Sequence, residues 1–447
     1  MTEDPPLGAR GSELAARDHD PADGGGKPTT LVPEAERPGL FEAFGVEIEL
    51  MIVDAESFDV RPICDDLIAS VAGEPASEIE LGPIAWSNEL TLHVVELKTN
   101  GPAPSLDGLS ERFHESVLLA GAKLDDLGAR LMPGAMHPWM DPHMETELWP
   151  HEYNEVYRTF DRIFGCAGHG WANLQSTHVN LPFRNDEEFA RLHAAIRVAL
   201  PLMPALSAAS PFQDGRRGPA LDGRLMAYRS NARRVPSVTG RVIPEEAFSR
   251  EQYEREILGR IYADLAPHDP DGVLRHEWAN ARGAIARFDR GSIEIRVIDT
   301  QESPAADLAV VRAIVALVRS LAVGRLAERD LAEDPSTDEL ADLLDGAIVQ
   351  GEEAVVDQHR ILGVLGLADR PVGLGEVWRR LIDADPPDDG AGAWTRHLET
   401  ILDEGPLARR MIRAAGQSPE RSDLRRVAEA MCLCLERNES FRDADAG

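Results

Sequence analysis

Cysteine, lysine and long apolar runs are all scarce in this chain of 447 residues. The four cysteines, two of them in a Cys-x-Cys pair near the C-terminus, are too few and too scattered for a disulfide framework or a zinc site. No run approaches the ~18 consecutive apolar residues of a membrane-spanning helix. The N-terminus also lacks the basic and apolar regions of a secretory signal. These absences predict a cytoplasmic protein without a membrane span.

Positive charge is the other shortage. The sequence has 78 acidic and 46 basic residues, a formal net charge of −32, and its only lysines are Lys27, Lys98 and Lys123. Because such a charge repels nucleic acid and anionic membranes, we expect neither as a partner. We expect small-molecule partners instead, and association of identical copies stays open. The acid excess with almost no lysine leads to the hypothesis of a salt-adapted protein.

Three common catalytic signatures are missing as well. The chain has no GxxxxGK[ST] loop, no GxGxxG after a strand pattern and no GxSxG elbow. A P-loop, a Rossmann-type nucleotide site and an α/β-hydrolase nucleophile are therefore not supported.

The chain does contain a mixture of strand and helix patterns. Residues 1–38 are rich in Pro, Gly, Ala and Asp without apolar periodicity, which predicts a disordered acidic leader. Strand patterns cover 44–54, 88–100, 176–183 and 291–299, and helical patterns cover 105–131, 186–209, 305–329 and most of 338–437. We predict an α+β fold, with a catalytic core over 39–304 built on an antiparallel sheet with flanking helices. A helical part over 305–447 is expected to pack on the same domain.

The first strand pattern carries two glutamates on one face. Glu47 and Glu49 lie two residues apart, so their carboxylates project from the same side, about 6.6 Å apart. Val46, Ile48 and Leu50 form the opposite face. Like charges on a half-buried face are costly unless a cation or a proton neutralises them. For this motif alone, an exposed face with ordinary surface glutamates is the alternative.

Three further strand patterns place polar groups among apolar neighbours. The second has Glu96 and Lys98, the third His178 and Asn180, and the fourth Glu294 and Arg296. For Glu96, an internal ion pair with Lys98 is the alternative interpretation. Four such strands together favour a metal site. Several glutamates with one histidine suit Mg²⁺ or Mn²⁺ better than structural zinc.

Arginines gather in two stretches near these strands. Arg229 and Arg234 lie in AYRSNARR, and Arg287, Arg290 and Arg296 lie in ARFDRGSIEIR. The planar guanidinium group suits phosphate and carboxylate, so both stretches are candidates for binding an anionic substrate. Ion pairs with the abundant acidic residues are the alternative explanation.

Seven segments resemble the glutamate–cysteine ligase family of the second type, carboxylate–amine ligases related to glutamine synthetase. These segments run in order across residues 40 to 304. They are GVEIEL (45–50), VVELKTNGP (94–102), MHPW (136–139), THVNLPF (177–183), LPLMPALSAASPF (200–212), AYRSNARRVPSVTG (227–240) and GSIEIRVIDTQESP (291–304).

The resemblance implies a curved antiparallel sheet as the catalytic floor and two or three Mg²⁺ ions around ATP, with Mn²⁺ as an alternative ion. It implies that the metal ligands are Glu47, Glu49, Glu96, His178 and Glu294. Arg296 and Glu294 are the expected catalytic residues. The expected ATP- or substrate-binding residues are Arg229, Arg234, Tyr228, Asn180 and Arg287. The motif GVEIEL departs from the family's usual GVEEEF, because Ile48 replaces a glutamate that faces the other way.

The implied activity is ATP-dependent amide formation. A glutamate γ-carboxylate is activated as an acyl phosphate and joined to an amine, whose identity the resemblance does not transfer. Two alternatives remain. One is an inactive family member that senses a ligand, and the other is a Mg²⁺-dependent phosphohydrolase that uses the same carboxylates on water.

Overall fold

A computed structural model describes residues 37–325, 334–368, 370–387 and 393–443. The predicted leader, 1–38, lies outside these ranges except for its last two residues. Among the described helices, none combines the length and apolar character needed to cross a membrane.

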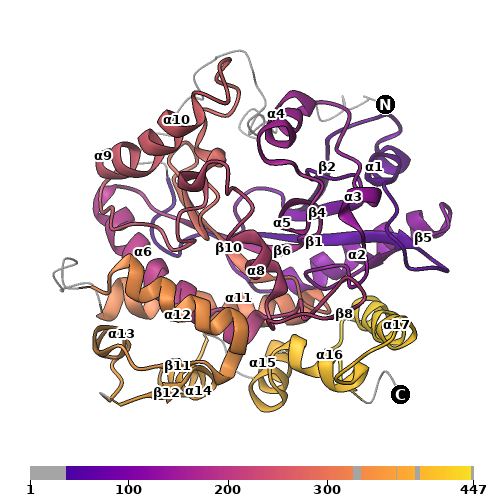
Figure 1. Cartoon of the computed structure of the whole chain (residues 1–447). Helices are drawn as coiled ribbons and strands as arrows, with labels where there is room; N and C mark the ends of the chain where they lie inside the picture. The colour runs from indigo at the N-terminus through magenta and orange to yellow at the C-terminus, as the bar shows by residue number, and fades with distance from the viewer. Residues whose placement is uncertain (1–36, 326–333, 369, 388–392, 444–447) are drawn as a thin grey trace, which may run out of the picture.

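One antiparallel sheet forms the centre of the molecule (Figure 1). Its strands lie in the order β2-β3-β4-β1-β6-β10-β9, and β5 pairs with the far end of β1. The strands are β1 (Gly45–Asp54), β2 (Glu78–Leu81), β3 (Ile84–Asn88), β4 (Val94–Thr99), β5 (Ala129–Met132), β6 (Ser176–Pro182), β9 (Ala284–Arg287) and β10 (Ser292–Asp299). Two short hairpins lie apart from it: β7 (Phe212–Gln213) with β8 (Arg216–Arg217), and β11 (Val355–Val356) with β12 (Val372–Gly373). The predicted antiparallel α+β fold is confirmed.

Helices surround this sheet. Before the last strand of the sheet they are α1 (Cys64–Ala72), α2 (Leu109–Asp125), α3 (Pro142–Glu145), α4 (Asn154–Phe164), α5 (His169–Ala172), α6 (Asp186–Ala199), α7 (Pro204–Ser207), α8 (Gly223–Tyr228), α9 (Arg250–Tyr253) and α10 (Gly259–Leu265). The later ones are α11 (Pro304–Arg319), α12 (Thr337–Gln350), α13 (His359–Leu365), α14 (Leu374–Ala384), α15 (Ala393–Glu404), α16 (Leu407–Ala415) and α17 (Arg421–Arg437).

The alternation in β1 decides how the sheet is covered. Val46, Ile48, Leu50 and Ile52 are buried in one large apolar cluster that also contains residues of α2, α6 and α11. This cluster continues into α12, α14 and α15, so helices from the chain's last third share a core with the sheet. Figure 1 shows α6, α11 and α12 along one side of the strands. The division at residue 304 stays a prediction.

Four strands of the sheet were not predicted. β2, β3, β5 and β9 are four or five residues long, and so short an apolar run shows no decisive periodicity. The stretch 88–100, predicted as one strand, instead contains the end of β3, a turn over 89–93 and then β4. This turn moves Glu89 out of the strand.

Candidate active site

Strand register brings the predicted metal ligands together on one face of the sheet. Glu47 lies opposite His178 on β6, and Glu49 lies opposite Glu96 on β4. Glu294 on β10 is one strand further, opposite Asn180. Since side chains two residues apart share a face, all the carboxylates project toward the same side. That side is opposite the large apolar cluster.

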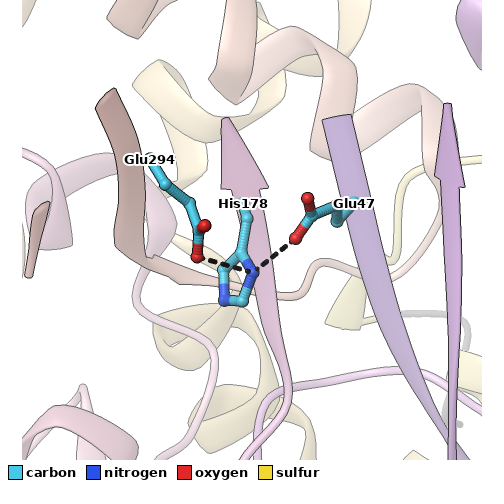
Figure 2. Close-up of side chains that lie close together, drawn as sticks. All are labelled: Glu47, His178 and Glu294. Carbon is cyan, nitrogen blue, oxygen red and sulfur yellow. Dashed lines mark hydrogen bonds and ion pairs between the residues drawn. The ribbon is translucent and has the colours of Figure 1, made fainter. Parts of the chain in front are cut away.

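The histidine ring is the centre of this arrangement. His178 Nδ1 lies 2.9 Å from Glu47 Oε2 and 3.9 Å from Glu294 Oε1. Figure 2 shows the two carboxylates approaching the ring from either side, each from its own strand. On the ring's other edge, Nε2 lies 3.7 Å from Glu49 Oε1 and 2.9 Å from the Ser176 hydroxyl.

Two sets of potential metal ligands therefore share one histidine. Glu47, His178 and Glu294 offer ligand atoms within 4.8 Å of one another, and Glu49, Glu96 and His178 do the same. Glu49, Glu96 and Glu294 are less than 10% exposed. The alternative of ordinary surface glutamates, weighed for Glu47 and Glu49, is therefore wrong for Glu49. Carboxylate oxygens with one imidazole are a donor set that fits Mg²⁺ or Mn²⁺.

The carboxyl groups in this cluster differ in how readily they ionise. Burial opposes ionisation of Glu47, but the hydrogen bond and charge of His178 hold its pKa well below the usual range. Glu294 behaves similarly: burial is outweighed by Arg296, so its pKa is lowered. In contrast, burial and the charge of Glu47 raise the pKa of Glu96 to about 7. Protons thus occupy part of the cluster at neutral pH, and a divalent cation is the natural replacement for them.

A β-bulge places Arg296 beside the ligands. The β10–β6 register shifts between Ile295 and Ile298, so that two residues of β10 face His178 alone. Bulges of this kind redirect a side chain and are frequent next to active sites. Arg296 Nε lies 2.7 Å from Glu294 Oε1, and its backbone carbonyl accepts a hydrogen bond from the buried Arg224. The guanidinium group is thereby held at the edge of the carboxylate cluster.

A close backbone contact fixes Asn180. Gly45 lies opposite Asn180, and a Cβ at position 45 would come within 2.9 Å of the Asn180 Cβ. The glycine that opens the GVEIEL motif is thus required by packing. The Asn180 amide donates to Glu47 Oε1 at 3.0 Å. This bond orients the carboxylate toward His178.

Two other predicted binding residues border the cluster. Arg287 on β9 is buried, with Nη1 3.5 Å from Glu294 Oε2. Tyr228, at the end of α8, is half-buried; burial raises its pKa, while a hydrogen bond with Arg296 and that residue's charge oppose the rise. Both residues lie next to the Glu294–Arg296 end of the site.

Arg229 and Arg234 are engaged elsewhere in the structure. Arg229 pairs with Asp345 on α12 at 2.5 Å. Arg234 donates to the backbone carbonyls of Arg162 and Ile163 at the end of α4. The sequence-based alternative of ion pairing with acidic residues thus describes Arg229 in this conformation. Their role in substrate binding stays a prediction.

Glu89 is a site residue that the sequence pattern did not single out. Burial, together with the charges of Glu49 and Glu96, raises the pKa of Glu89 well above its usual range. The signal was hidden because Glu89 was assigned to a continuous strand over 88–100, whereas it lies in the turn at 89–93, where the charges of Glu49 and Glu96 act on it. Glu96 also forms the expected ion pair with Lys98, at 3.5 Å, although Lys98 lies closer to Glu78, at 2.7 Å.

Comparisons with known proteins agree with this geometry. The family model "Glutamate-cysteine ligase family 2 (GCS2)" matches residues 43–430. An uncharacterized protein of Archaeoglobus fulgidus is 32% identical over 399 residues, which cover 89% of this chain and 99% of that protein. A Corynebacterium glutamicum protein named "Putative glutamate--cysteine ligase 2" is 25% identical over 283 residues, which cover 62% of this chain and 66% of that protein.

A solved structure shows the same fold at low sequence identity. Glutamate–cysteine ligase from Francisella tularensis, in complex with AMP, superposes with a TM-score of 0.59 over 90% of both chains, at 13% identity. Together with the family match across most of the sequence, these relations show that the chain belongs to glutamate–cysteine ligase family 2, a family of ATP-dependent ligases.

Proposed function

We propose that the protein is an ATP- and Mg²⁺-dependent ligase that joins the γ-carboxylate of glutamate to an amine. The observation that carries this proposal is the pair of buried carboxylate sets that share His178. Four glutamates, Glu47, Glu49, Glu96 and Glu294, supply carboxylate oxygens around one imidazole, as expected for a site that binds divalent ions. The names of the relatives make cysteine the first amine to test.

In this proposal Glu47, His178 and Glu294 would hold one ion, and Glu49, Glu96 and His178 a second. Glu89 is a further candidate ligand beside Glu49 and Glu96. When bound, the ions neutralise charge on the phosphate oxygens during phosphoryl transfer.

The protein's own cations complete the site. Arg296 is held by Glu294, by the bulge and by its hydrogen bond with Tyr228, so its guanidinium group lies at the edge of the cluster. A guanidinium fork can bind the oxygens of a terminal phosphate or of the substrate carboxylate. Arg287 is the second cation at this end.

The chemistry follows from the inertness of a carboxylate toward amines. Transfer of the terminal phosphoryl group of ATP to the carboxylate oxygen gives an acyl phosphate and ADP. An uncharged amine then attacks the acyl carbon, the amide C–N bond forms and phosphate leaves. The arginines bind the transferring group, and the buried site keeps water away from the activated acyl group.

The test is a screen of amino acids and amines for ADP release with glutamate, ATP and Mg²⁺ present. ADP release that requires both a carboxylate and an amine, with an amide product in the mass spectrum, supports the proposal. Release that needs neither co-substrate would identify a phosphohydrolase. ATP or ligand binding with no turnover for any pair would favour the sensor interpretation.

A further inference from the structure

Arg287 connects the carboxylate cluster to a second acidic pair outside it. Its Nη1 faces Glu294 at 3.5 Å, as described above. Its Nε faces away from the cluster, 3.6 Å from Asp289 Oδ1 and 4.0 Å from Glu277 Oε2. Glu277 begins the 3-10 turn η5 (Glu277–Ala279), and Asp289 lies in the turn between β9 and β10. Arg287 therefore spans two acidic groups.

The two outer carboxyl groups are in contact with each other. A hydrogen bond links Glu277 and Asp289, which requires a proton on one of them. Within the described ranges, Glu277 Oε2 and Asp289 Oδ1 are buried without a hydrogen-bond partner, whereas the two carboxyl groups also accept hydrogen bonds from the backbone N–H groups of Asp289 and Arg290 respectively. Two adjacent carboxylates rarely ionise together, because the second charge is repelled by the first.

The proton resides on Glu277 at neutral pH. Burial raises the pKa of Glu277 to about 8, and the hydrogen bond and charge of Asp289 add to the rise. For Asp289, burial is outweighed by the hydrogen bond from Glu277 and the charge of Arg287, so its pKa is lowered. The pair thus carries one negative charge at neutral pH, and that charge faces Arg287.

We propose that Glu277 and Asp289 are positioning residues, which share one proton and hold Arg287 in reach of Glu294 and of the substrate anion. This inference rests on the proposed ligase function. With one proton in the pair, Arg287 is attracted about equally from both ends. With no proton, the outer pair is doubly negative and draws Arg287 away from the site.

Other groups near the pair do not supply a competing charge switch. Tyr253 on α9 and Tyr262 on α10 face Glu277, and burial raises the pKa of both, so both stay neutral. Arg290, in the same turn as Asp289, adds a permanent positive charge beside it. Burial lowers the pKa of His276, so it is neutral in the range where Glu277 loses its proton. Among these neighbours of Arg287 and Asp289, Glu277 is thus the group that changes charge in mildly alkaline solution.

The experiment uses steady-state kinetics of the full chain across about pH 6.5 to 9.5. For the wild type, we expect kcat/KM to fall as pH rises through about 8, mainly through KM for ATP or for the carboxylate. Glu277→Gln keeps a neutral hydrogen-bonding group at every pH, so its profile should lack this alkaline fall. The readout is the shape of the curve of kcat/KM against pH, and not the absolute value of kcat/KM. Glu251→Gln, a substitution on the exposed part of α9, is the matched control and should keep the wild-type profile.

The double variant Glu277→Gln/Asp289→Asn tests the holding role itself. It removes the outer negative charge, so KM should rise about tenfold, the size expected for a weakened charge-assisted hydrogen bond. Asp289→Asn alone leaves Glu277 as the single anion and should raise KM much less. An alkaline fall that persists in Glu277→Gln would overturn the proposal, as would a double variant with wild-type KM.

Failure of this inference can be distinguished from failure of the proposed function. If the wild type makes no amide with any pair of substrates, the proposed function is wrong. The pH dependence of ATP affinity, measured by calorimetry in the same variants with Mg²⁺, still tests the positioning role. A wild-type affinity that is flat through pH 8 counts against the inference even when the enzyme turns over.

Discussion

Two buried ionic regions of this molecule differ in how their charges are matched. Arg410 on α16 and Glu302 before α11 form a pair at 2.6 Å, and both side chains are fully buried. Phe441 ties the same pair to the end of the described chain through its backbone N–H and carbonyl. The metal-site candidates on the sheet instead bring several carboxylates around one histidine.

The difference separates a structural role from a functional one. In a matched buried pair, the mutual attraction offsets part of the cost of removing two charges from water. In the carboxylate cluster, burial and the charges of neighbouring carboxylates raise the pKa of some members, as Glu96 and Glu89 show. Carboxyl groups gathered on one face with raised pKa values are therefore a better marker of the site than burial of charge alone.

Breaking the matched pair should give the largest change in stability. Arg410→Met leaves Glu302 buried without a cation, so the free energy of unfolding should fall by about 3–5 kcal/mol. Denaturant melts measure the loss, and activity per folded molecule should be unchanged. The double variant Glu302→Gln/Arg410→Met should recover most of it. A single variant as stable as the wild type would mean that this pair contributes little.

The carboxylate cluster on the sheet should instead be stabilised by a divalent cation. Mg²⁺ that binds the folded state raises the free energy of unfolding by about 2.7 kcal/mol at 100 times its dissociation constant. Thermal melts with and without Mg²⁺ should show this gain in the wild type. The gain should be lost in Glu47→Gln/Glu49→Gln and kept in the surface variant Glu251→Gln. An equal gain in all three proteins would place the ion elsewhere.

Removing one ligand should affect activity more than stability. Glu294→Gln keeps the side-chain volume but removes a charge between His178 and Arg296. Ligation should fall at least ~10-fold at saturating Mg²⁺, while circular dichroism stays as in the wild type. A variant that keeps more than about a tenth of the activity would exclude Glu294 as a ligand.

Much of this site could be predicted from the sequence, because period-2 alternation shows which side chains share a face of a strand even when the fold is not known. Glu47, Glu49, His178 and Glu294 alternate with aliphatic residues, so each was placed on a common polar face before any strand order was known. Once the strands pair in register, these side chains must meet. The resemblance to the ligase family supplied their roles, and the alternation supplied their geometry.

The remaining features depend on contacts between distant segments. The bulge that presents Arg296 arises from the pairing of β10 with β6, and no local pattern encodes it. Arg229 was expected at the site, but Asp345, more than a hundred residues away in sequence, pairs with it. Glu89 was missed because a turn inside an apolar stretch resembles a continuous strand.

Because the pKa of Glu96 is raised, the contribution of the carboxylate cluster to stability should depend on pH. Because the folded-state value is about 7 and the ordinary value 4.5, Glu96 contributes stability at low pH that is lost as pH rises through about 7. Glu96→Gln should therefore match the wild type in stability near pH 4 and exceed it at pH 8 without Mg²⁺. Denaturant melts at both pH values measure this. A variant less stable than the wild type at pH 8 would show that the Lys98 pair outweighs the repulsion.

Added salt should change the contribution of surface charges to stability more than that of buried charges. Of the effects predicted here, this one is the smallest per charged group. The chain's formal charge of −32 favours expansion, and the Debye length falls from ~10 Å at 0.1 M to ~3 Å at 1 M salt. Screening relieves more repulsion in the compact state than in the unfolded state. It also weakens exposed pairs such as Arg241–Asp342, but each of these contributes about 1 kcal/mol or less. The buried Arg410–Glu302 pair is hardly screened.

We therefore expect the melting midpoint of the wild type to rise with KCl from about 0.1 to 3 M. The midpoint of Arg410→Met should rise in parallel, at lower temperatures throughout. A flat or falling midpoint would contradict adaptation to high salt. A variant that converges on the wild type would show that solvent reaches the buried pair.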